Sequence, residues 1–387
     1  MRPRSRQSHL LEWRIGLQTS RFVKILTDTD GMHAALAQAA KAMYTATPNP
    51  RVGCVIVRNG DVLAEGHTQP TGFAHAEAYA LHHAQQQGID VRGATVYVSL
   101  EPCSHHGRTP PCADALINAG IARVVVAIED PNPLVAGQGL AKLRAAGIQV
   151  ELGTLAEPAR EINRGFLHRM QNARPWVRMK IAASIDGGTA LQNGQSQWIT
   201  SAQARDDGHH WRARSCAILT GIGTIQQDDP QLNVRAVDTP RQPRRVVVDS
   251  HLAISPQARM LQDAPAWIFT AVDHAEPAAQ LRSQSHEVIT LPDDTGKVDL
   301  HALMRELGRR EINELHVEAG FKLNGSLLRA GVVDELLLYM APCLLGPAQG
   351  LARLPVLEQL DHRLSFYFHD IERVGPDVRL RLIRNPS

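Results

Sequence analysis

The chain has 387 residues, of which 43% are hydrophobic and 21% are charged, close to the averages for soluble globular proteins. This composition excludes a disordered, a collagen-like and a coiled-coil protein, and the length predicts two or three domains. The 41 basic and 39 acidic residues leave a formal net charge of +2, too small for a general attraction to nucleic acid or to anionic lipid. We therefore expect any phosphate group to be bound by a few local residues.

The cysteine count and the hydropathy pattern indicate where in the cell the protein is expected to work. Five cysteines, an odd and sparse set in so long a chain, do not form the pattern of a disulfide framework, so we expect reduced thiols in a cytoplasmic protein. The longest apolar runs have the length of a strand and fall short of the ~18 residues of a membrane-spanning helix. We therefore expect no membrane partner.

The first 29 residues differ in composition from the rest of the chain. Within residues 1–24, six basic residues stand against Glu12 alone, an Arg-rich and acid-poor composition that organelle-targeting peptides also show. The stretch lacks the apolar core of a secretory signal. We interpret it as a basic extension that precedes the folded part of the chain, because we expect that the folded part could begin at Met32 without loss. A targeting peptide is the alternative interpretation.

From residue 30 onward, the pattern predicts helices and strands in alternation. The first helical pattern ends at the Thr47–Pro50 stretch, since a residue that precedes proline is disfavoured in a helix. Asn59-Gly60 is a strong hairpin turn between two β-rich runs. The alternation favours an α/β sandwich with helices on both faces of the sheet. The expected helices are 33–43, 75–86, 112–119 and 139–146, and the expected strands are 52–57, 62–66, 94–100, 123–128 and 148–152.

A polar helix over 157–170 and the Arg174-Pro175 break precede a second predicted α/β domain. Its expected strands are 177–183, 217–220, 245–249, 266–270, 314–318 and 334–341, its expected helices are 201–215, 300–307 and 323–330, and strands 364–368 and 378–383 are expected to close the sheet as a pair. The predicted organisation is an extension over 1–29, a first domain over 30–153, a linker helix over 154–173 and a second domain over 174–387.

The first domain contains one cluster of metal-binding residue types. His75 begins a predicted helix, and Cys103 and Cys112 lie in a segment that leads into the next one. One imidazole and two thiols are suitable ligands for Zn²⁺, and three protein ligands leave the fourth position to water, as a catalytic zinc site requires. The partial positive charge of a helix N-terminus favours the thiolate form that binds metal.

Glu77 follows two residues after His75. Residues two apart on a helix point about 200° from each other, so Glu77 is poorly placed to share the metal and better placed as an acid–base group beside it. Such a carboxylate and a metal-activated water are suited to hydrolytic deamination of an amidine-type carbon. His-x-Glu followed by Pro-Cys and a second Cys is typical of zinc base deaminases, although here the cysteines are nine residues apart, where that signature has three.

Other interpretations stay open at this point. A fourth protein ligand, His105 or His106, would make the zinc site closed and structural, although such a site has no need of Glu77. Cys54 lies in an apolar strand and is expected to serve packing. Asn49, in its proline-bounded loop, is either a turn residue or a hydrogen-bonding group for a sugar hydroxyl.

Together these motifs resemble the family of bifunctional riboflavin-biosynthesis deaminase/reductases. The first half matches it at 48–55, 75–77, 100–112 and 130–137, and the second half at 180–187, 196–201, 224–235 and 317–320. The likeness begins near Asp30 and continues in order to the C-terminus, and its longest motifs are far more specific than a lone short pattern. It implies a cytidine-deaminase-like α/β/α sandwich followed by a dihydrofolate-reductase-like α/β domain.

The resemblance implies two consecutive reactions on small phosphorylated pyrimidines, with Zn²⁺ and NADPH as cofactors. The deaminase would hydrolyse the pyrimidine amino group of 2,5-diamino-6-ribosylamino-4(3H)-pyrimidinone 5′-phosphate and release ammonia. The reductase would use NADPH to convert the ribosyl chain of 5-amino-6-(5-phosphoribosylamino)uracil into a ribityl chain.

Site residues are implied at the positions of this sequence that match the family's motifs. The implied zinc ligands are His75, Cys103 and Cys112, and the implied proton carrier is Glu77. The implied NADPH contacts are Ala182, Trp198, Thr224, Asp228, Ser250, Gly320, Phe321, Lys322, Leu323, Asn324, Gly325 and Ser326. The implied substrate contacts are Ser196, Arg212, Leu232, Arg235 and Glu318, with Asn49 as the candidate in the first domain.

The residues of the second domain support this implication in part. The segment Thr220–Thr224 follows a strand but lacks the Gly-x-Gly-x-x-Gly pattern, and by itself marks a turn more often than a dinucleotide site. Gly320 precedes a helix whose free amides either bind a phosphate or are capped. Arg212 and Arg235 suit phosphate or sugar, with a plain surface charge as the alternative for each.

The sequence departs from the family at two places. Phe321-Lys322 stands where the family commonly has Pro-Thr, and Cys216 stands where Asp is common and is expected to be a packing position. Two further hypotheses are a nucleic-acid-editing deaminase with an RNA-binding second half, and a deaminase fused to an inactive, dimerising reductase-like domain. An aromatic content of only 4% and a net charge of +2 weaken the first of these, so we expect no nucleic-acid partner. We separately expect the enzyme to be a homo-oligomer.

Overall fold

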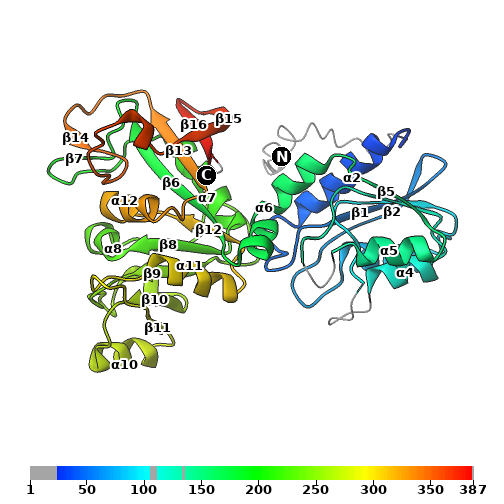
Figure 1. Ribbon diagram of the computed structural model, residues 1–387, viewed down its shortest axis with the longest axis horizontal. Coiled ribbons are helices and arrows are strands. Elements are labelled where there is room, and N and C mark those ends of the chain that lie inside the picture. The colour runs from blue at the N-terminus through cyan, green and yellow to red at the C-terminus, as the bar shows by residue number, and fades with distance from the viewer. Residues whose placement is uncertain (1–23, 105–110, 133–135, 386–387) are drawn as a thin grey trace, which may run out of the picture. The chain divides into compact units, whose positions relative to one another are not determined.

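The computed structural model describes residues 24–104, 111–132 and 136–385. The chain folds as two units, over 1–171 and 172–387 (Figure 1), each with its own sheet and its own hydrophobic core. No helix within the described ranges combines the length and the apolar character that crossing a membrane requires.

The first unit is built on a five-stranded mixed sheet. Its strands are ordered β2-β1-β3-β4-β5, where β1 is antiparallel to both of its neighbours and β3, β4 and β5 are parallel. Figure 1 shows α2 on one face of this sheet and α4 and α5 on the other, as the sequence predicts. The strands are β1 (Gly53–Arg58), β2 (Asp61–His67), β3 (Thr95–Val98), β4 (Arg123–Val126) and β5 (Gln149–Leu152), and the helices are α2 (Asp28–Lys41), α3 (Ala76–Gln86), α4 (Cys112–Asn118), α5 (Gln138–Ala145) and α6 (Ala156–Asn172).

The first described helix starts earlier than its apolar spacing predicts. Thr27 and Asp30 form a capping box, in which each side chain accepts the other residue's backbone N–H. Asp28 accepts two hydrogen bonds of 2.7 Å from Arg123 and one from the Tyr97 hydroxyl. The expectation that Met32 opens the folded part without loss is therefore wrong, while most of the predicted basic extension (1–23) lies outside the described residues.

Close packing of α3 against the β1–β2 hairpin positions the candidate metal ligands. Asn59 and Gly60 both have positive φ, as the predicted two-residue turn requires. A Cβ atom added to Gly66 would lie 2.2 Å from the carbonyl oxygen of Ala76, so only glycine allows this approach. The start of α3 is thereby held against β2.

The helix α6 occupies most of the range expected for a linker. Three of its residues, Ala159, Ile162 and Phe166, are buried in the core of the first unit. Asn163 accepts the backbone N–H of Arg51 at 2.7 Å and donates to the Arg51 carbonyl at 3.0 Å. These contacts attach the helix to the first unit.

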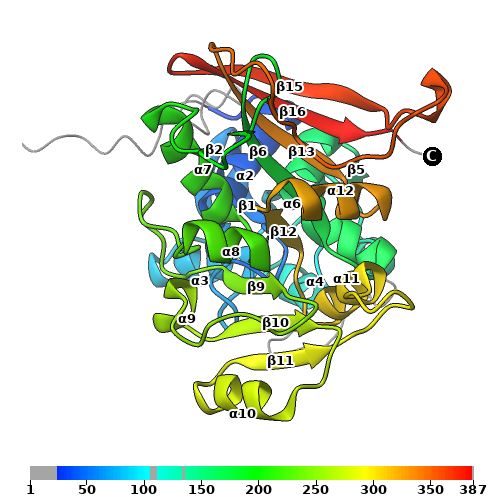
Figure 2. The same ribbon diagram turned by 90° about the vertical axis from the view of Figure 1, so that its left-hand side faces the viewer.

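The second unit is built on a nine-stranded sheet, ordered β11-β10-β9-β8-β12-β6-β13-β16-β15 (Figure 2). Neighbouring strands are parallel from β11 to β13, and β13, β16 and β15 pair antiparallel, so the predicted closing pair is confirmed. The strands are β6 (Trp176–Ser184), β8 (Ala217–Gly221), β9 (Arg244–Val248), β10 (Ala266–Thr270), β11 (Glu287–Thr290), β12 (Glu314–Val317), β13 (Glu335–Ala341), β15 (Phe366–Val374) and β16 (Asp377–Arg384), with β7 (Ala190–Leu191) and β14 (Ala348–Gln349) as a separate pair.

Helices connect the parallel strands of this sheet. They are α7 (Ala202–Arg214), α8 (Ile222–Asp228), α9 (Arg259–Gln262), α10 (Ala275–Ser283), α11 (Leu300–Arg309) and α12 (Phe321–Arg329). In α/β sheets of this kind, ligands bind beyond the carboxyl ends of the parallel strands, and α8 and α12 begin there, after β8 and β12. The two units confirm the predicted α/β class.

Candidate active sites

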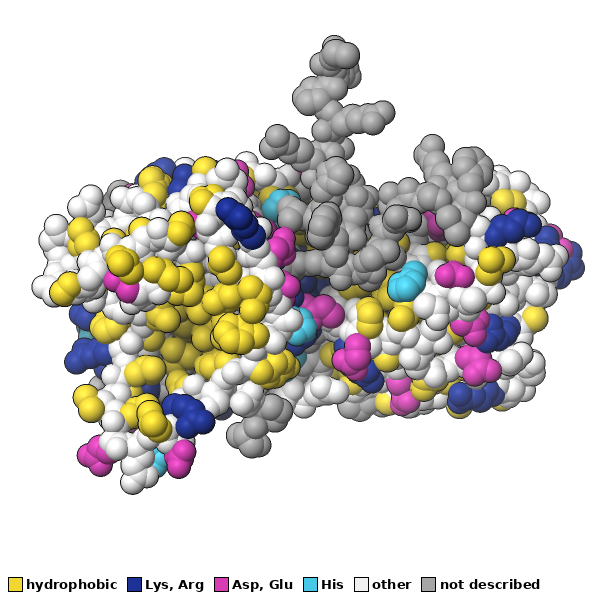
Figure 3. All heavy atoms as spheres, turned by 90° about the horizontal axis from the view of Figure 1, so that it is seen from above, with side chains coloured by type: hydrophobic (Ala, Val, Ile, Leu, Met, Phe, Trp, Pro, Cys, Tyr) yellow, Lys and Arg dark blue, Asp and Glu magenta, His cyan; other side chains and the backbone are white. Residues whose placement is uncertain are grey.

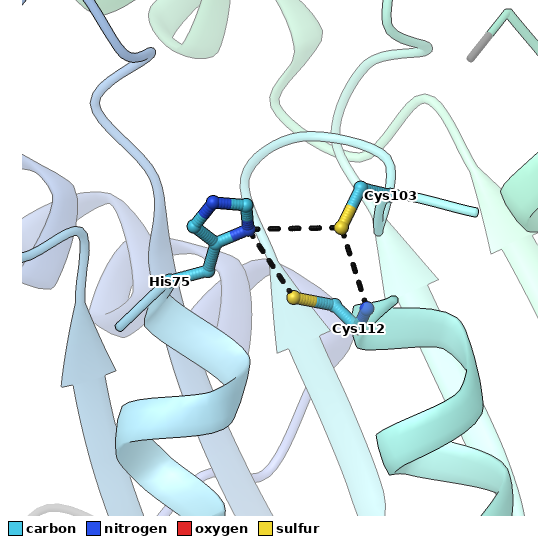
Figure 4. Close-up of side chains that lie close together, drawn as sticks. All are labelled: His75, Cys103 and Cys112. Carbon is cyan, nitrogen blue, oxygen red and sulfur yellow. Dashed lines mark hydrogen bonds between the residues drawn. The ribbon is translucent and has the colours of Figure 1, made fainter. Parts of the chain in front are cut away.

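Three predicted ligands converge in the first unit. His75 is the N-cap residue of α3, Cys103 lies in the segment after β3, and Cys112 is the first residue of α4. Figure 4 shows their side chains pointing toward one another, with Nδ1 of His75 3.6 Å from the sulfur of Cys103 and 3.4 Å from that of Cys112. The three donor atoms all lie within 4.8 Å of one another.

This donor set fits a zinc ion. Around one tetrahedral Zn²⁺ at usual bond lengths, nitrogen and sulfur ligands lie about 3.5–3.8 Å apart, close to the distances found here. The sulfur of Cys103 also accepts the backbone N–H of Cys112 at 3.3 Å. Hydrogen bonds from Cys112 and His75 lower the pKa of Cys103 to about 4, so the thiolate form that metals require is favoured.

Glu77 lies buried beside this cluster. Its side chain is in the first turn of α3 and only 3% exposed. Burial raises the pKa of its carboxyl group to about 7, with a further contribution from the negative charge of Cys103. The carboxyl also hydrogen-bonds the Cys112 side chain, so a second group able to hold a proton stands next to the donor atoms.

The remaining candidates of the first unit are less constrained. His105 and His106, which would close the site, lie outside the described residues. Cys54 is fully buried in β1, in agreement with a packing role, and burial raises the pKa of its thiol well above the usual value. Asn49 is half-buried and its backbone N–H donates to the carbonyl of Ala46, which leaves both interpretations of its side chain open.

The second unit contains a cavity of 670 Å³ at the carboxyl ends of its parallel strands. The cavity brings together candidates that are up to 142 residues apart in the sequence, from Ala182 to Asn324. The predicted residues that line it are Ala182, Ser196, Trp198, Arg212, Thr224, Asp228, Leu232, Arg235, Glu318, Gly320, Phe321 and Asn324.

Five predicted cofactor contacts do not line this cavity. The Ser250 hydroxyl accepts the backbone N–H of Val298 at 3.2 Å. The segment from Phe321 to Ser326 forms the first turns of α12, where Leu323 packs against Gly221 and Gly325 approaches the backbone of Arg353. The cavity lining omits Ser250, Lys322, Leu323, Gly325 and Ser326.

Two of the predicted substrate contacts in the cavity, Arg212 and Glu318, form an ion pair. Arg212 donates to both carboxylate oxygens of Glu318 and to the carbonyl of Asn233, at 2.9 Å for the latter. Burial alone would raise the pKa of Glu318, but the charge and hydrogen bonds of Arg212 outweigh it and hold that pKa well below its usual value. Glu318 is therefore ionised throughout the neutral range.

Five charged or titratable residues of the cavity lining have no role in the sequence-based assignment. Lys180 opens the motif 180–187, which was a signal available in the sequence, and burial lowers the pKa of its amino group. Arg205, Asp206 and His209 lie in the first two turns of α7, and Arg259 begins α9. Nothing in the sequence separates these four from surface residues before the fold brings them to one cavity.

Comparison with known families supports two catalytic units. The model of the "Cytidine and deoxycytidylate deaminase zinc-binding region" matches residues 26–128, and that of the "RibD C-terminal domain" matches residues 175–380. The riboflavin biosynthesis protein RibD of Escherichia coli is 47% identical over 367 residues, covering 91% of this chain and 98% of that protein. The RibD of Haemophilus influenzae is 44% identical, with 90% and 95% covered.

Solved structures agree with these matches. A RibD from Acinetobacter baumannii superposes with a TM-score of 0.83 at 39% identity, covering 93% of this chain and 99% of that one. A Thermotoga maritima protein described as a diaminohydroxyphosphoribosylaminopyrimidine deaminase and 5-amino-6-(5-phosphoribosylamino)uracil reductase has the same TM-score at 31% identity, with 92% and 99% covered. The match to a RibD C-terminal domain argues against an RNA-binding second half.

Proposed function

Because this chain belongs to the RibD family of riboflavin-biosynthesis proteins, we propose that the donor cluster of the first unit and the cavity of the second unit are its two active sites. Members of this family join a deaminase to a reductase, and this protein is accordingly an enzyme with both activities, dependent on zinc and on NADPH. The observation that carries the residue assignment is the convergence of His75, Cys103 and Cys112 beside the buried Glu77.

The deaminase acts on the diaminopyrimidinone ribosyl phosphate, with His75, Cys103 and Cys112 as the ligands of Zn²⁺. A zinc ion held by these residues would lower the pKa of a water molecule and so supply a better nucleophile at neutral pH. Glu77 accepts the proton of the attacking water and returns it to the amino group, as a carbon–oxygen bond forms and the carbon–nitrogen bond breaks to release ammonia. Asn49 is assigned to the ribose of this substrate.

The reductase acts on the phosphoribosylaminouracil in the cavity, where NADPH supplies a hydride. Such a transfer depends mainly on holding two carbon atoms close together, which is a task of the lining residues. Ser196, Arg212, Leu232, Arg235 and Glu318 bind the substrate. The cofactor contacts are Ala182, Trp198, Thr224, Asp228, Ser250 and the start of α12 from Gly320 to Ser326.

One assay tests both assignments. The purified enzyme, incubated with the diamino substrate, is expected to release ammonia without NADPH and to oxidise one NADPH per ammonia when NADPH is added. One zinc ion per chain is expected, and its removal by a chelator should stop ammonia release but leave NADPH oxidation on the deaminated substrate. Ammonia release without any NADPH oxidation on either substrate would refute the reductase assignment and favour an inactive second unit.

The assembly and the location of the enzyme belong to the same proposal. The protein forms a homo-oligomer through the second unit, on whose surface hydrophobic side chains gather (Figure 3). Large exposed apolar residues concentrate between 344 and 371, among them Val356 at 93% and Leu360 at 82% exposure. All five cysteines are free, which supports a reducing, cytoplasmic compartment. The proposed domains are a deaminase domain that ends near residue 153 and a reductase domain over 174–387, with the helix within 154–173 between them. The deaminase domain includes the start of α2 at Asp28, so the extension proposed for 1–29 stops before Thr27.

A further inference from the structure

One row of side chains on α7 lines the cavity of the second unit. Arg205, His209 and Arg212 are spaced by four and three residues, which places them on one face of the helix. All three line the cavity, together with Asp206 and Gly208 of the same helix. The neighbouring His210 is not part of the lining, since it points to another side of the helix.

His209 differs from the two arginines of this row in its contacts. Arg205 donates to the Thr200 carbonyl at 2.7 Å and its guanidinium lies 4.4 Å from the centre of the Trp198 ring, and Arg212 is held by Glu318. His209 is only 6% exposed, and its Nδ1 is buried without a hydrogen-bond partner in the described part of the chain. Buried polar atoms in folded proteins are nearly always paired, so this one points to a group that arrives with a ligand.

The charged groups that act on His209 include Arg212, Arg235 and Glu318, which are three of the proposed substrate contacts. Burial, followed by the positive charges of Arg212 and Arg235, lowers the pKa of His209 to about 4, and Glu318 acts in the opposite direction. The imidazole is therefore uncharged at neutral pH, with one nitrogen that donates and one that accepts. Arginine side chains only donate, and the Glu318 carboxylate is already occupied by Arg212, so an uncharged group of this kind suits a hydroxyl.

We propose that His209 binds the reductase substrate through a hydrogen bond between its imidazole and a hydroxyl group of the ribosyl chain. The proposal rests on the proposed function of the second unit, because the substrate it names is the one assigned to that cavity. The proposal adds a substrate-binding residue on α7, between Arg205 and Arg212. It means that α7 lines the part of the cavity that holds the substrate.

The test compares His209→Leu and His209→Gln with His210→Leu in steady-state kinetics on the phosphoribosylaminouracil and on NADPH. One hydrogen bond to an uncharged group corresponds to about a fivefold to tenfold change in affinity. His209→Leu is expected to raise the KM for the uracil substrate by about that factor, and His209→Gln, which keeps a hydrogen-bonding group, to raise it less. The KM for NADPH is expected to stay within twofold, as are all constants of His210→Leu.

Ammonia release by the first unit and the melting temperature report whether each variant is folded. If His209→Leu does not fold, His209→Phe, which keeps a flat ring but has no ring nitrogen, is tested for weaker binding of ribose 5-phosphate in calorimetry, where a dissociation constant raised by at least twofold supports the proposal. A KM for the uracil substrate or a dissociation constant for ribose 5-phosphate that changes less than twofold in the folded Leu or Phe variant overturns it, as does an effect confined to NADPH. A wild-type enzyme that reduces no uracil substrate refutes the reductase assignment itself, and the role of His209 with it.

Discussion

At the scale of single residues, the proposed active site of the first unit contains a carboxyl group that is almost fully buried. Glu77 is 3% exposed and contacts the thiol of Cys112, so its proton affinity is set by the surrounding protein, and a zinc ion held by the three ligands would add its own charge. The glutamine variant keeps the shape of this side chain but cannot carry a proton.

We predict that Glu77→Gln lowers the rate of ammonia release by about 100-fold or more, the usual contribution of a general acid–base group. NADPH oxidation on the deaminated substrate should not change. The measurement is a coupled ammonia assay with the zinc content determined in parallel. Glu151→Gln, at an exposed position of β5, serves as the control, and a Glu77→Gln enzyme with ordinary ammonia release would contradict the mechanism.

The ion pair between Arg212 and Glu318 in the cavity of the second unit leads to a prediction about pH. The pKa of Glu318 lies well below its usual value, because the charge and hydrogen bonds of Arg212 outweigh the effect of burial. A carboxylate with a lowered pKa stays ionised as the pH falls through the ordinary glutamate range and loses its charge only below that range.

The KM of the reductase for the uracil substrate should therefore show no change with an apparent pKa near that of free glutamate, about 4.3. Glu318→Gln should raise this KM by about tenfold, because Arg212 loses its ionic partner and binds in a less fixed position. Kinetics at about pH 3.5 to 8, with ammonia release as the control for folding, test both statements. A titration of KM at the usual glutamate pKa would show that the pair does not form in the enzyme.

At the scale of elements, the start of α2 lies in a stretch whose sequence resembles an extension. Its capping box and the contacts of Asp28 with Arg123 and Tyr97 attach residues 27–30 to the sheet. A lost helix cap costs about 1 kcal/mol, and a partly exposed ion pair contributes up to about 1 kcal/mol.

A chain that begins at Met32 should therefore unfold at a lower urea concentration than one that begins at Lys24, with a loss of about 2 kcal/mol in the free energy of unfolding of the first unit. Urea titrations that follow ammonia release measure this difference. Both truncated chains lack residues 1–23, so any difference between them comes from residues 24–31. Equal midpoints would show that the cap and the Asp28 contacts do not stabilise the unit.

Periodicity and turn residues were enough to predict most elements of both sheets. The strand over 266–270 and the helix entered after Ser201 agree with β10 and α7, and Asn59-Gly60 forms the expected turn. The sequence did not indicate that α2 starts at Asp28, because the polar residues of its first turn gain their stability from a cap and from a distant arginine. The short helix α10 and strand β11 were missed, since their exposed residues show little periodic pattern.

The two sites differed in how far the sequence alone could predict them. The metal donors carry a chemistry that few other patterns share, so His75, Cys103 and Cys112 were found from residue types and spacing. In the second unit, a cavity assembled from residues 180 to 349 gives no local signal, and most of its candidates came from the family resemblance. His209 needed the fold, because burial without a partner is a property of position and not of sequence.

At the scale of the whole molecule, β15 is the edge strand of the sheet that the structure describes in the second unit. Among the described strands it pairs with β16 alone, and Phe368 and Ile371 on this strand are each 60% exposed. Exposed edge strands with apolar side chains pair readily with another chain, and natural monomers usually protect them with charges or a covering loop. A second copy of the protein would cover these side chains.

We predict that the double variant Phe368→Lys and Ile371→Lys is monomeric where the wild-type enzyme forms the proposed homo-oligomer, because two buried charges at the interface would each lack a partner. Light scattering on a sizing column at micromolar concentration measures the mass of each species. Val62→Lys, at an exposed apolar position of the first unit, is the matched control and should leave the oligomer intact. A monomeric wild-type enzyme, or a double variant that keeps the wild-type mass, would mean that the exposed apolar residues of the second unit do not hold copies together.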